Sequence, residues 1–325
     1  MATYYGTYGQ KVQYLASDPS DPQVGQVWYN STSAVLKVRA VTTAGTWASG
    51  GNLNTTRREL SSSGIQTAAI AFGGTTTDVV TSTESYNGSS WTAVSSMNTG
   101  RQNLGGAGTQ TATVAFGGYS TNYTGATELW NGTSWTNNPT GLNTSREQLS
   151  GTGIQTAAIA AGGDTGPAVS SASESYNGTS WTNTPSLNTA RRSLNQVGAG
   201  TQTAALIAGG SLPGVTAATE SWNGSSWTTV NSLNTARGGL GLGGTQTAAF
   251  AAGGGTPTAT GATELWNGTS WSTNPNSMST ARSLVSRAGT QSSGLISGGS
   301  DGSNLSATEE FTGPGVGTTK TVTVS

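Results

Sequence analysis

Residues 101–135 read RQNLGGAGTQTATVAFGGYSTNYTGATELWNGTSW, and this stretch decides the fold. An arginine opens it, small and apolar residues lead to a double glycine, and a Glu-x-aromatic sequence, an Asn-Gly pair and a tryptophan follow. The same order of features returns about every 45 residues along the chain. Self-similarity at this period indicates an architecture built from repeated units that stack on one another.

The charged and aromatic positions of the repeat occur once in each unit. The arginines are Arg57, Arg101, Arg146, Arg191, Arg237 and Arg282. The glutamates are Glu84, Glu128, Glu174, Glu220, Glu264 and Glu309. The tryptophans are Trp47, Trp91, Trp135, Trp181, Trp227 and Trp271.

Each unit is typical of four short strands. Small residues after the arginine predict a tightly packed inner strand, and the apolar run that ends at Gly117-Gly118 predicts a strand buried on both faces. Asn131-Gly132 tolerates the positive φ of a tight turn, so the Glu-aromatic and tryptophan segments form an outer hairpin. Four strands in about 45 residues match one blade of a β-propeller.

At these positions the sequence resembles kelch repeats, which have the same order of double glycine, acidic-aromatic strand, tryptophan and arginine. The resemblance covers about residues 47–311 and implies an all-β propeller. One departure is the outer hairpin, where the aromatic residue and the tryptophan lie only five positions apart, as in Tyr86 and Trp91. We therefore expect a shorter outer hairpin than kelch repeats usually have.

The spacing of the repeats predicts how the ring closes. The last unit reaches Glu309 but has no tryptophan after it, whereas Trp47 precedes Arg57 by the same ten residues that separate Trp91 from Arg101. The strand at Trp47 is thus expected to complete the last blade, which removes open sheet edges. The prediction is an all-β fold, a six-bladed β-propeller over residues 47–311 with kelch-like four-stranded blades.

The segments outside the repeats are 1–46 and 312–325. Residues 25–38, GQVWYNSTSAVLKV, predict a small hairpin and resemble a short module of tail-fibre and other virion proteins of tailed phages. The resemblance implies an attachment or assembly element, and the alternative is a hairpin packed on the propeller. The β-prone tail 312–325 is expected to pair with this hairpin or with a neighbouring subunit. Candidate docking residues are Tyr4, Tyr5, Tyr8, Tyr14, Trp28 and Tyr29.

Composition excludes several function classes. The chain has 325 residues, a net charge of −1 and 8% charged residues, with no Cys and no His. Thiol and imidazole catalysis, thiolate metal sites and a nucleic-acid footprint are therefore excluded. No apolar run is long enough for a membrane span, and no basic-then-apolar signal segment opens the sequence. We expect no cofactor, no metal, no nucleic-acid partner and no membrane insertion.

The repeated side chains permit two interpretations. The arginines and glutamates form either a charged ring that binds an anion at the propeller mouth, or braces in which each arginine holds a loop or pairs with a glutamate. A residue repeated in every blade usually serves the blade, which favours braces. The repeated tryptophans likewise favour packing between blades over stacking on sugars.

Catalysis is not expected. Asp78, Asp164 and Asp301 are the aspartates of the variable loops, and they lie in three different blades, whereas a glycosidase needs two nearby carboxylates. The outer hairpins lack the Asp of sialidase Asp boxes, and kelch-type copper oxidases need His and Cys. These aspartates offer at most weak cation sites through oxygen ligands.

The loops between the second and third strands differ from blade to blade, and loops on a rigid scaffold commonly carry binding. The alternative is that they are tolerant surface loops. The side chains suited to hydrogen bonding and stacking on a ligand are Tyr119, Asn122, Tyr123, Asp164, Asp301 and Asn304.

These features predict a non-enzymatic virion protein of a tailed phage: a tail fibre, a receptor-binding protein or a capsid or tail decoration. Its N-terminal module docks on other virion proteins or on copies of itself, and its propeller is displayed on the virion surface toward a host glycan or protein. The alternative is a free, extracellular or cell-surface lectin-like propeller that binds carbohydrate. A glycan hydrolase is the third hypothesis.

Overall fold

The computed structural model describes residues 12–23, 25–41, 44–194, 198–315 and 317–322. Throughout these ranges the secondary structure is β-strand, turn and loop, and no helix occurs. The described residues accordingly include no helix of the length and apolarity that crossing a membrane requires. The chain divides into two compact units, one formed by Met1–Gly45 with Gly313–Ser325 and the other by Thr46–Thr312.

The larger unit consists of antiparallel four-stranded sheets, and each of the first five is built from one repeat with its strands in sequence order. The first sheet contains β5 (Ser61–Ile65), β6 (Ala68–Phe72), β7 (Thr83–Tyr86) and β8 (Trp91–Val94). The second contains β9 (Gly105–Gly108), β10 (Thr113–Phe116), β11 (Thr127–Trp130) and β12 (Trp135–Asn138). The third contains β13 (Ser150–Ile154), β14 (Ala157–Ala161), β15 (Ser173–Tyr176) and β16 (Trp181–Thr184).

The remaining repeats build sheets of the same kind. The fourth contains β17 (Ala199–Gly200), β18 (Ala205–Ala208), β21 (Thr219–Trp222) and β22 (Trp227–Val230), with a small hairpin of β19 (Ser211–Leu212) and β20 (Gly214–Val215) in its loop. The fifth contains β23 (Gly241–Gly244), β24 (Ala249–Ala252), β25 (Thr263–Trp266) and β26 (Trp271–Asn274). The sixth contains β27 (Ser286–Gly289), β28 (Ser293–Ser297), β29 (Thr308–Thr312) and β4 (Thr46–Ser49).

Strand β4 comes from the other end of the repeat region and supplies the outer strand of the sixth sheet. It pairs with β29 in antiparallel register, with Trp47 opposite Phe311 and Thr46 opposite Thr312. This pairing is the one that the spacing between Trp47 and Arg57 predicts. The sheet edge at β29 is therefore covered by the chain itself.

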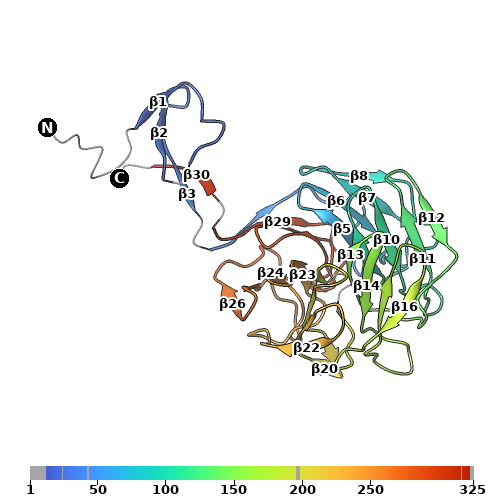
Figure 1. Ribbon diagram of the computed structural model, residues 1–325. Coiled ribbons are helices and arrows are strands. Elements are labelled where there is room, and N and C mark those ends of the chain that lie inside the picture. The colour runs from blue at the N-terminus through green and yellow to red at the C-terminus, as the bar shows by residue number, and fades with distance from the viewer. Residues whose placement is uncertain (1–11, 24, 42–43, 195–197, 316, 323–325) are drawn as a thin grey trace. The chain divides into compact units, whose positions relative to one another are not determined.

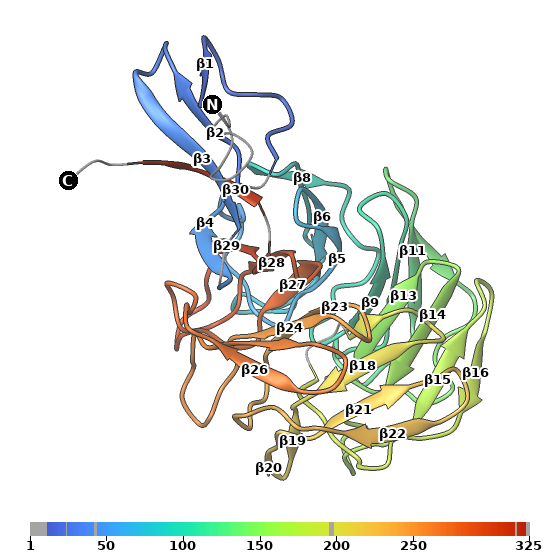
Figure 2. The same cartoon turned by 60° about the vertical axis from the view of Figure 1, so that its left-hand side comes forward.

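The sheets are arranged in a propeller-like way around the inner strands (Figures 1 and 2). Each inner strand lies beside the inner strand of the next sheet, in the order β5, β9, β13, β17, β23, β27, and β27 lies beside β5. The inner strands consist largely of small residues, for example GGAG in β9, where a Cβ at Gly105 would lie 2.3 Å from the ring of Phe116.

The apolar core lies between neighbouring sheets. Ile70 and Phe72 of the first sheet pack with Leu104, Trp130 and Trp135 of the second in one buried cluster. The tryptophan that opens each outer strand also donates its indole N–H to a hydroxyl of the preceding sheet, from Trp135 to Thr83 Oγ1 at 3.0 Å and correspondingly in the other sheets. Each tryptophan therefore joins two sheets by packing and by a hydrogen bond.

The smaller unit is a mixed four-stranded sheet. Strand β1 (Gln13–Leu15) runs parallel to β2 (Val27–Asn30), which pairs antiparallel with β3 (Val35–Val41), and β3 pairs antiparallel with β30 (Gly317–Thr321). Figure 2 shows β30, in red, beside β3, in blue. The C-terminal tail was expected to pair either with the N-terminal hairpin or with a neighbouring subunit, and in the structure it pairs with the hairpin.

Candidate functional site

The variable loops leave the second strand of each sheet through the double glycine. Gly117 and Gly118 have φ of 63° and 100°, values in the left-handed region that favours glycine. The turn carries Tyr119 into a bridge with Gln102, the residue after the repeat arginine, and the other sheets pair the corresponding residues. The arginine loops and the variable loops therefore lie together on one face of the larger unit, here called the variable-loop face.

A closed ring of backbone hydrogen bonds lies at the centre of this face. Its members are the second residues after the repeat arginines, and we call them the neck ring: Glu59, Asn103, Gln148, Ser193, Gly239 and Leu284. The backbone N–H of each member donates to the carbonyl oxygen of the preceding member at 2.8–3.2 Å. The exception is Ser193, where the N–H of the next residue, Leu194, donates to Gln148. All six have left-handed φ, between 53° and 69°. Since hydrogen-bonded strands lie about 5 Å apart, six members give a ring of roughly 5 Å radius.

The six repeat arginines lie beneath this face as buried braces. Arg101 is 0% exposed, donates to the Gly117 and Ala126 carbonyls at 2.9 and 2.6 Å, and pairs with Glu128 at 2.9 Å. Glu128 also accepts the backbone N–H of Asn98 at 2.8 Å. The other five pairs are buried in the same way. In four of the sheets the arginine donates to carbonyls at both ends of its variable loop. All six pairs are buried and present no charge to a ligand.

Burial and pairing act against each other on these arginines. Burial lowers the pKa of each guanidinium, and the paired glutamate raises it. The carboxylate therefore stabilises the charged form of the arginine at a position that water does not reach.

Three of the six ligand candidates from the sequence come together. The rings of Tyr119 and Tyr123 meet edge to face with centroids 5.3 Å apart. Asp164, in the next loop, is 4% exposed, accepts the Gly166 N–H at 2.7 Å and forms an ion pair with Arg192. A Cβ at Gly166 would lie 2.7 Å from the ring of Tyr123, so the two loops touch.

Glu147 adds a second carboxyl beside this cluster. It accepts a hydrogen bond from Asn103 at 3.1 Å, and burial, followed by the charges of Glu59 and Asp164, raises its pKa. Burial and the charges of Glu147 and Asp164 also raise the pKa of Tyr123. Tyr123 therefore keeps its phenolic proton at neutral pH and remains a hydrogen-bond donor.

Two other candidates from the sequence lie in the loop of the sixth sheet. Asn304 donates to the Thr76 carbonyl at 2.7 Å and accepts from Arg58 at 3.3 Å, so it ties its loop to that of the first sheet. Asp301 is exposed and accepts the N–H of Ser303 at 3.1 Å within its own loop. The structure therefore does not bring this pair together with the tyrosine cluster into one site.

The remaining candidate, Asn122, is exposed at the tip of the loop between the two tyrosines. Sequence reasoning missed four charged residues of this face: Arg58, Glu59, Glu147 and Arg192. The available signal was their position one or two residues after a repeat arginine, where the repeats differ from one another.

The charged groups occupy one side of the neck ring. At the corresponding positions the fifth and sixth sheets carry Gly238 and Ser283, and a cavity of about 230 Å³ lies there, lined also by Val215, Pro257 and Leu284. The variable-loop face therefore offers an aromatic, charged side and a side where small residues surround a cavity. Among the described residues no group of three or more acidic side chains is placed to hold a metal ion.

The docking candidates lie in the smaller unit. Tyr14 is 76% exposed and stacks on Tyr29 with centroids 5.1 Å apart. Trp28 is 0% exposed and donates its indole N–H to Asp18 at 3.0 Å, which corrects the expectation that it faces a partner. A large apolar ring is better buried in the unit's own sheet than left in water. Tyr4, Tyr5 and Tyr8 lie outside the described residues.

Comparisons with known proteins add no identification. No family model matches this sequence, and no curated protein matches it.

Proposed function

We propose that the six four-stranded sheets of residues 46–312 are the blades of a closed six-bladed propeller. Support comes from the cyclic order of the inner strands, in which β27 lies beside β5. Further support comes from β4, which completes the sixth sheet from the opposite end of the repeat region. The neck ring, in which the last backbone hydrogen bond returns to Glu59, fits the same closure.

We further propose that the protein is a non-enzymatic structural and binding component of a tailed-phage particle. The main support for this proposal is the strand pairing in the smaller unit. The segments on either side of the propeller in the sequence, β3 and β30, pair in one sheet. This sheet contains residues 25–38, which resemble a short module of virion proteins. The propeller is then a single insertion between two paired strands of an attachment module.

The charges of the propeller fit a frame and a binding surface better than an active site. Six arginine–glutamate pairs brace the loops, and Asp164 is neutralised by Arg192. The residues best suited to contact a host-surface glycan or protein are Tyr119 and Tyr123, whose rings meet on the variable-loop face. Aromatic faces beside hydrogen-bonding groups are a common means of sugar recognition.

Docking is tested on purified phage particles produced with the full-length chain. Immunogold labelling against the propeller is expected to mark the particles. Tyr14→Ala is expected to lower occupancy, because it removes the exposed ring that stacks on Tyr29. Ile154→Ala, at a 55% exposed apolar residue of the propeller, is the matched control and is expected to leave occupancy unchanged. Unlabelled particles, or equal occupancy for both variants, would count against docking through this unit.

The alternative, a free or cell-surface lectin-like propeller, is favoured by the same tyrosine pair. Glycan-array binding by the full chain is expected to fall in Tyr119→Ala and Tyr123→Ala, and to persist in Thr133→Ala, an exposed change in an outer-hairpin turn. Glycan binding by a chain that is found only free of particles would establish the alternative. If no glycan on the array is bound and the particles are labelled, the protein is a purely structural decoration of the particle.

A further inference from the structure

A second cavity lies at the opposite end of the inner strands from the neck ring. Each inner strand contributes a glycine with positive φ to its wall: Gly64, Gly108, Gly153, Gly200, Gly244 and Gly289. The cavity has a volume of about 160 Å³, which is room for roughly five water molecules. A Cβ at any of these glycines would lie only 2.0–2.2 Å from a backbone carbonyl oxygen at the start of the next strand, so this turn requires glycine.

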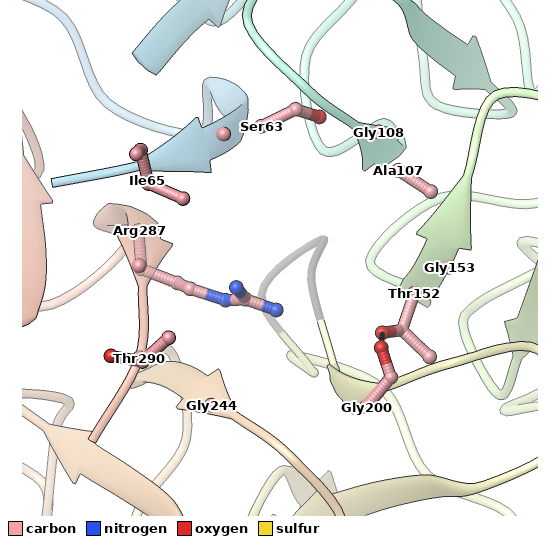
Figure 3. A pocket seen from close by; sticks show the side chains of 12 residues that line it. Ser63, Ile65, Ala107, Gly108, Thr152, Gly153, Gly200, Gly244, Arg287 and Thr290 are labelled. Carbon is pink, nitrogen blue, oxygen red and sulfur yellow. Dashed lines mark hydrogen bonds between the residues drawn. The ribbon is translucent and has the colours of Figure 1, made fainter. Parts of the chain in front are cut away.

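Arg287 of β27 extends into this cavity (Figure 3). At the corresponding positions the other inner strands carry Ser62, Gly106, Gly151, Gly198 and Leu242. The arginine is therefore no part of the repeat. It is only 9% exposed, and one terminal nitrogen donates to the Gly198 carbonyl across the channel.

Arg287 differs from the repeat arginines in having no carboxylate partner. All 14 acidic residues of the chain lie in its described part, and none of them forms an ion pair with Arg287. Its Nε–H is buried without a hydrogen-bond partner among the described residues, as in most of the repeat arginines, so the missing carboxylate is the difference. A buried charge without a counterion is costly, so the chain leaves here an interaction that another molecule can supply.

Burial lowers the pKa of Arg287 to about 9, and no neighbouring carboxylate acts in the other direction. The guanidinium is nevertheless charged at neutral pH. The cavity therefore has a positive potential, in a protein whose other buried arginines are neutralised by their partners.

The hydroxyls in the same wall are less available to a ligand. Ser63 Oγ is buried out of the reach of solvent, and Thr152 Oγ1 already donates to the Gly200 carbonyl at 2.9 Å. The charged guanidinium of Arg287 is therefore the donor that a ligand in the cavity meets. It is complementary to a ligand that only accepts hydrogen bonds.

We propose that this cavity is a binding site for a small oxyanion, a carboxylate, sulfate or phosphate group, held by Arg287. The guanidinium offers charged N–H groups to the bound oxygens. The site lies at the end of the inner strands away from the variable loops. It is therefore independent of the proposed role of the tyrosine cluster.

The test measures anion binding to the full-length protein at constant ionic strength. Sulfate, phosphate, acetate and glucuronate are titrated in chloride buffer by isothermal titration calorimetry and by thermal unfolding. Saturable binding is expected for at least one of them, with a rise in Tm of about 2–5 °C. Glucuronate binding would identify the acid group of a sugar as a ligand, and its failure beside binding of the inorganic anions would identify a free anion.

Arg287→Met is the decisive variant, because sulfate stabilises many proteins without a site. The saturable binding is expected to disappear in this variant, while any unsaturable rise of Tm remains. Arg287→Lys keeps the positive charge and is expected to restore part of the affinity.

If Arg287→Met does not fold, binding can be followed by NMR at Arg287 in the unmodified protein. The ¹⁵Nε–H resonance of Arg287 in the unmodified protein is expected to shift on anion binding, whereas the resonance of Arg101 stays in place. No saturable binding of any of the four anions, or binding that leaves the Arg287 resonance unmoved, would overturn the proposal.

Discussion

The larger unit contains two kinds of buried arginine. Arg101 and its five counterparts each contact a glutamate and the carbonyls of their own loop, and all of them are 0% exposed. Arg287 is almost as deeply buried but contacts only one backbone carbonyl among the described residues. The chain therefore provides carboxylate partners for the arginines of the frame and none for Arg287.

The largest expected effect comes from removing a frame arginine. Arg101→Met leaves Glu128 charged and buried without its partner, so the free energy of unfolding is expected to fall by about 3–5 kcal/mol. Urea unfolding of the full chain, followed by tryptophan fluorescence, measures it. A loss below about 1 kcal/mol would mean that the pair does not stabilise the blade.

The same substitution at the other arginine is expected to have the opposite sign. Arg287→Met removes a buried charge and leaves no carboxylate behind, so in chloride buffer stability is expected to stay equal or to rise by about 1 kcal/mol or more. The same urea experiment applies. A loss as large as that of Arg101→Met would remove the distinction between the two kinds of arginine.

The difference in stability between Arg287→Met and the unmodified protein is expected to depend on pH. Burial lowers the pKa of Arg287 from 12.5 to about 9, so between these values the unfolded chain holds a proton that the folded chain has lost. Stability of the unmodified protein therefore rises through this window relative to Arg287→Met. We expect the advantage of the variant to be full at pH 8 and to shrink by about 1 kcal/mol by pH 10. An advantage that is constant with pH would contradict this.

The smallest effect is expected at an exposed ion pair in the other unit. Hydrogen bonds from Lys37, Asn30 and Trp28 lower the pKa of Asp18 from 3.8 to about 2. The ionised carboxylate therefore contributes stability above about pH 4, and this contribution is lost as the pH falls toward 2. In the full chain, the indole N–H resonance of Trp28 should lose its protection from exchange across this window. Asp18→Asn should abolish that pH dependence.

Much of the larger unit was predictable because its residues recur in order. Asn131-Gly132 predicted the outer hairpin, and the distance from Trp47 to Arg57 predicted the origin of β4. The brace interpretation of the arginines followed from the cost of burying charge. The smaller unit was less accessible, because a single short segment has no repeat to reinforce it. The parallel pairing of β1 with β2 gave no sequence signal.

The neck ring and the cavity at Arg287 escaped prediction for a physical reason. A repeat alignment emphasises what the units share, whereas Arg287 replaces Ser, Gly or Leu in a single unit. The neck ring is a property of backbone conformation, and residues as different as Glu59 and Leu284 adopt the same left-handed φ in it. The contact of Asp164 with Arg192 likewise depends on which loops become neighbours, and only the assembled sheets determine that.

The chain passes between the two units twice, and a strand pair anchors both passages in each unit. Thr46 is paired with Thr312 in the larger unit, and Val41 is paired with Gly317 in the smaller unit. A cut in one passage, such as a proteolytic cut, therefore leaves the other passage intact. A unit held by a single tether would be released by the same cut.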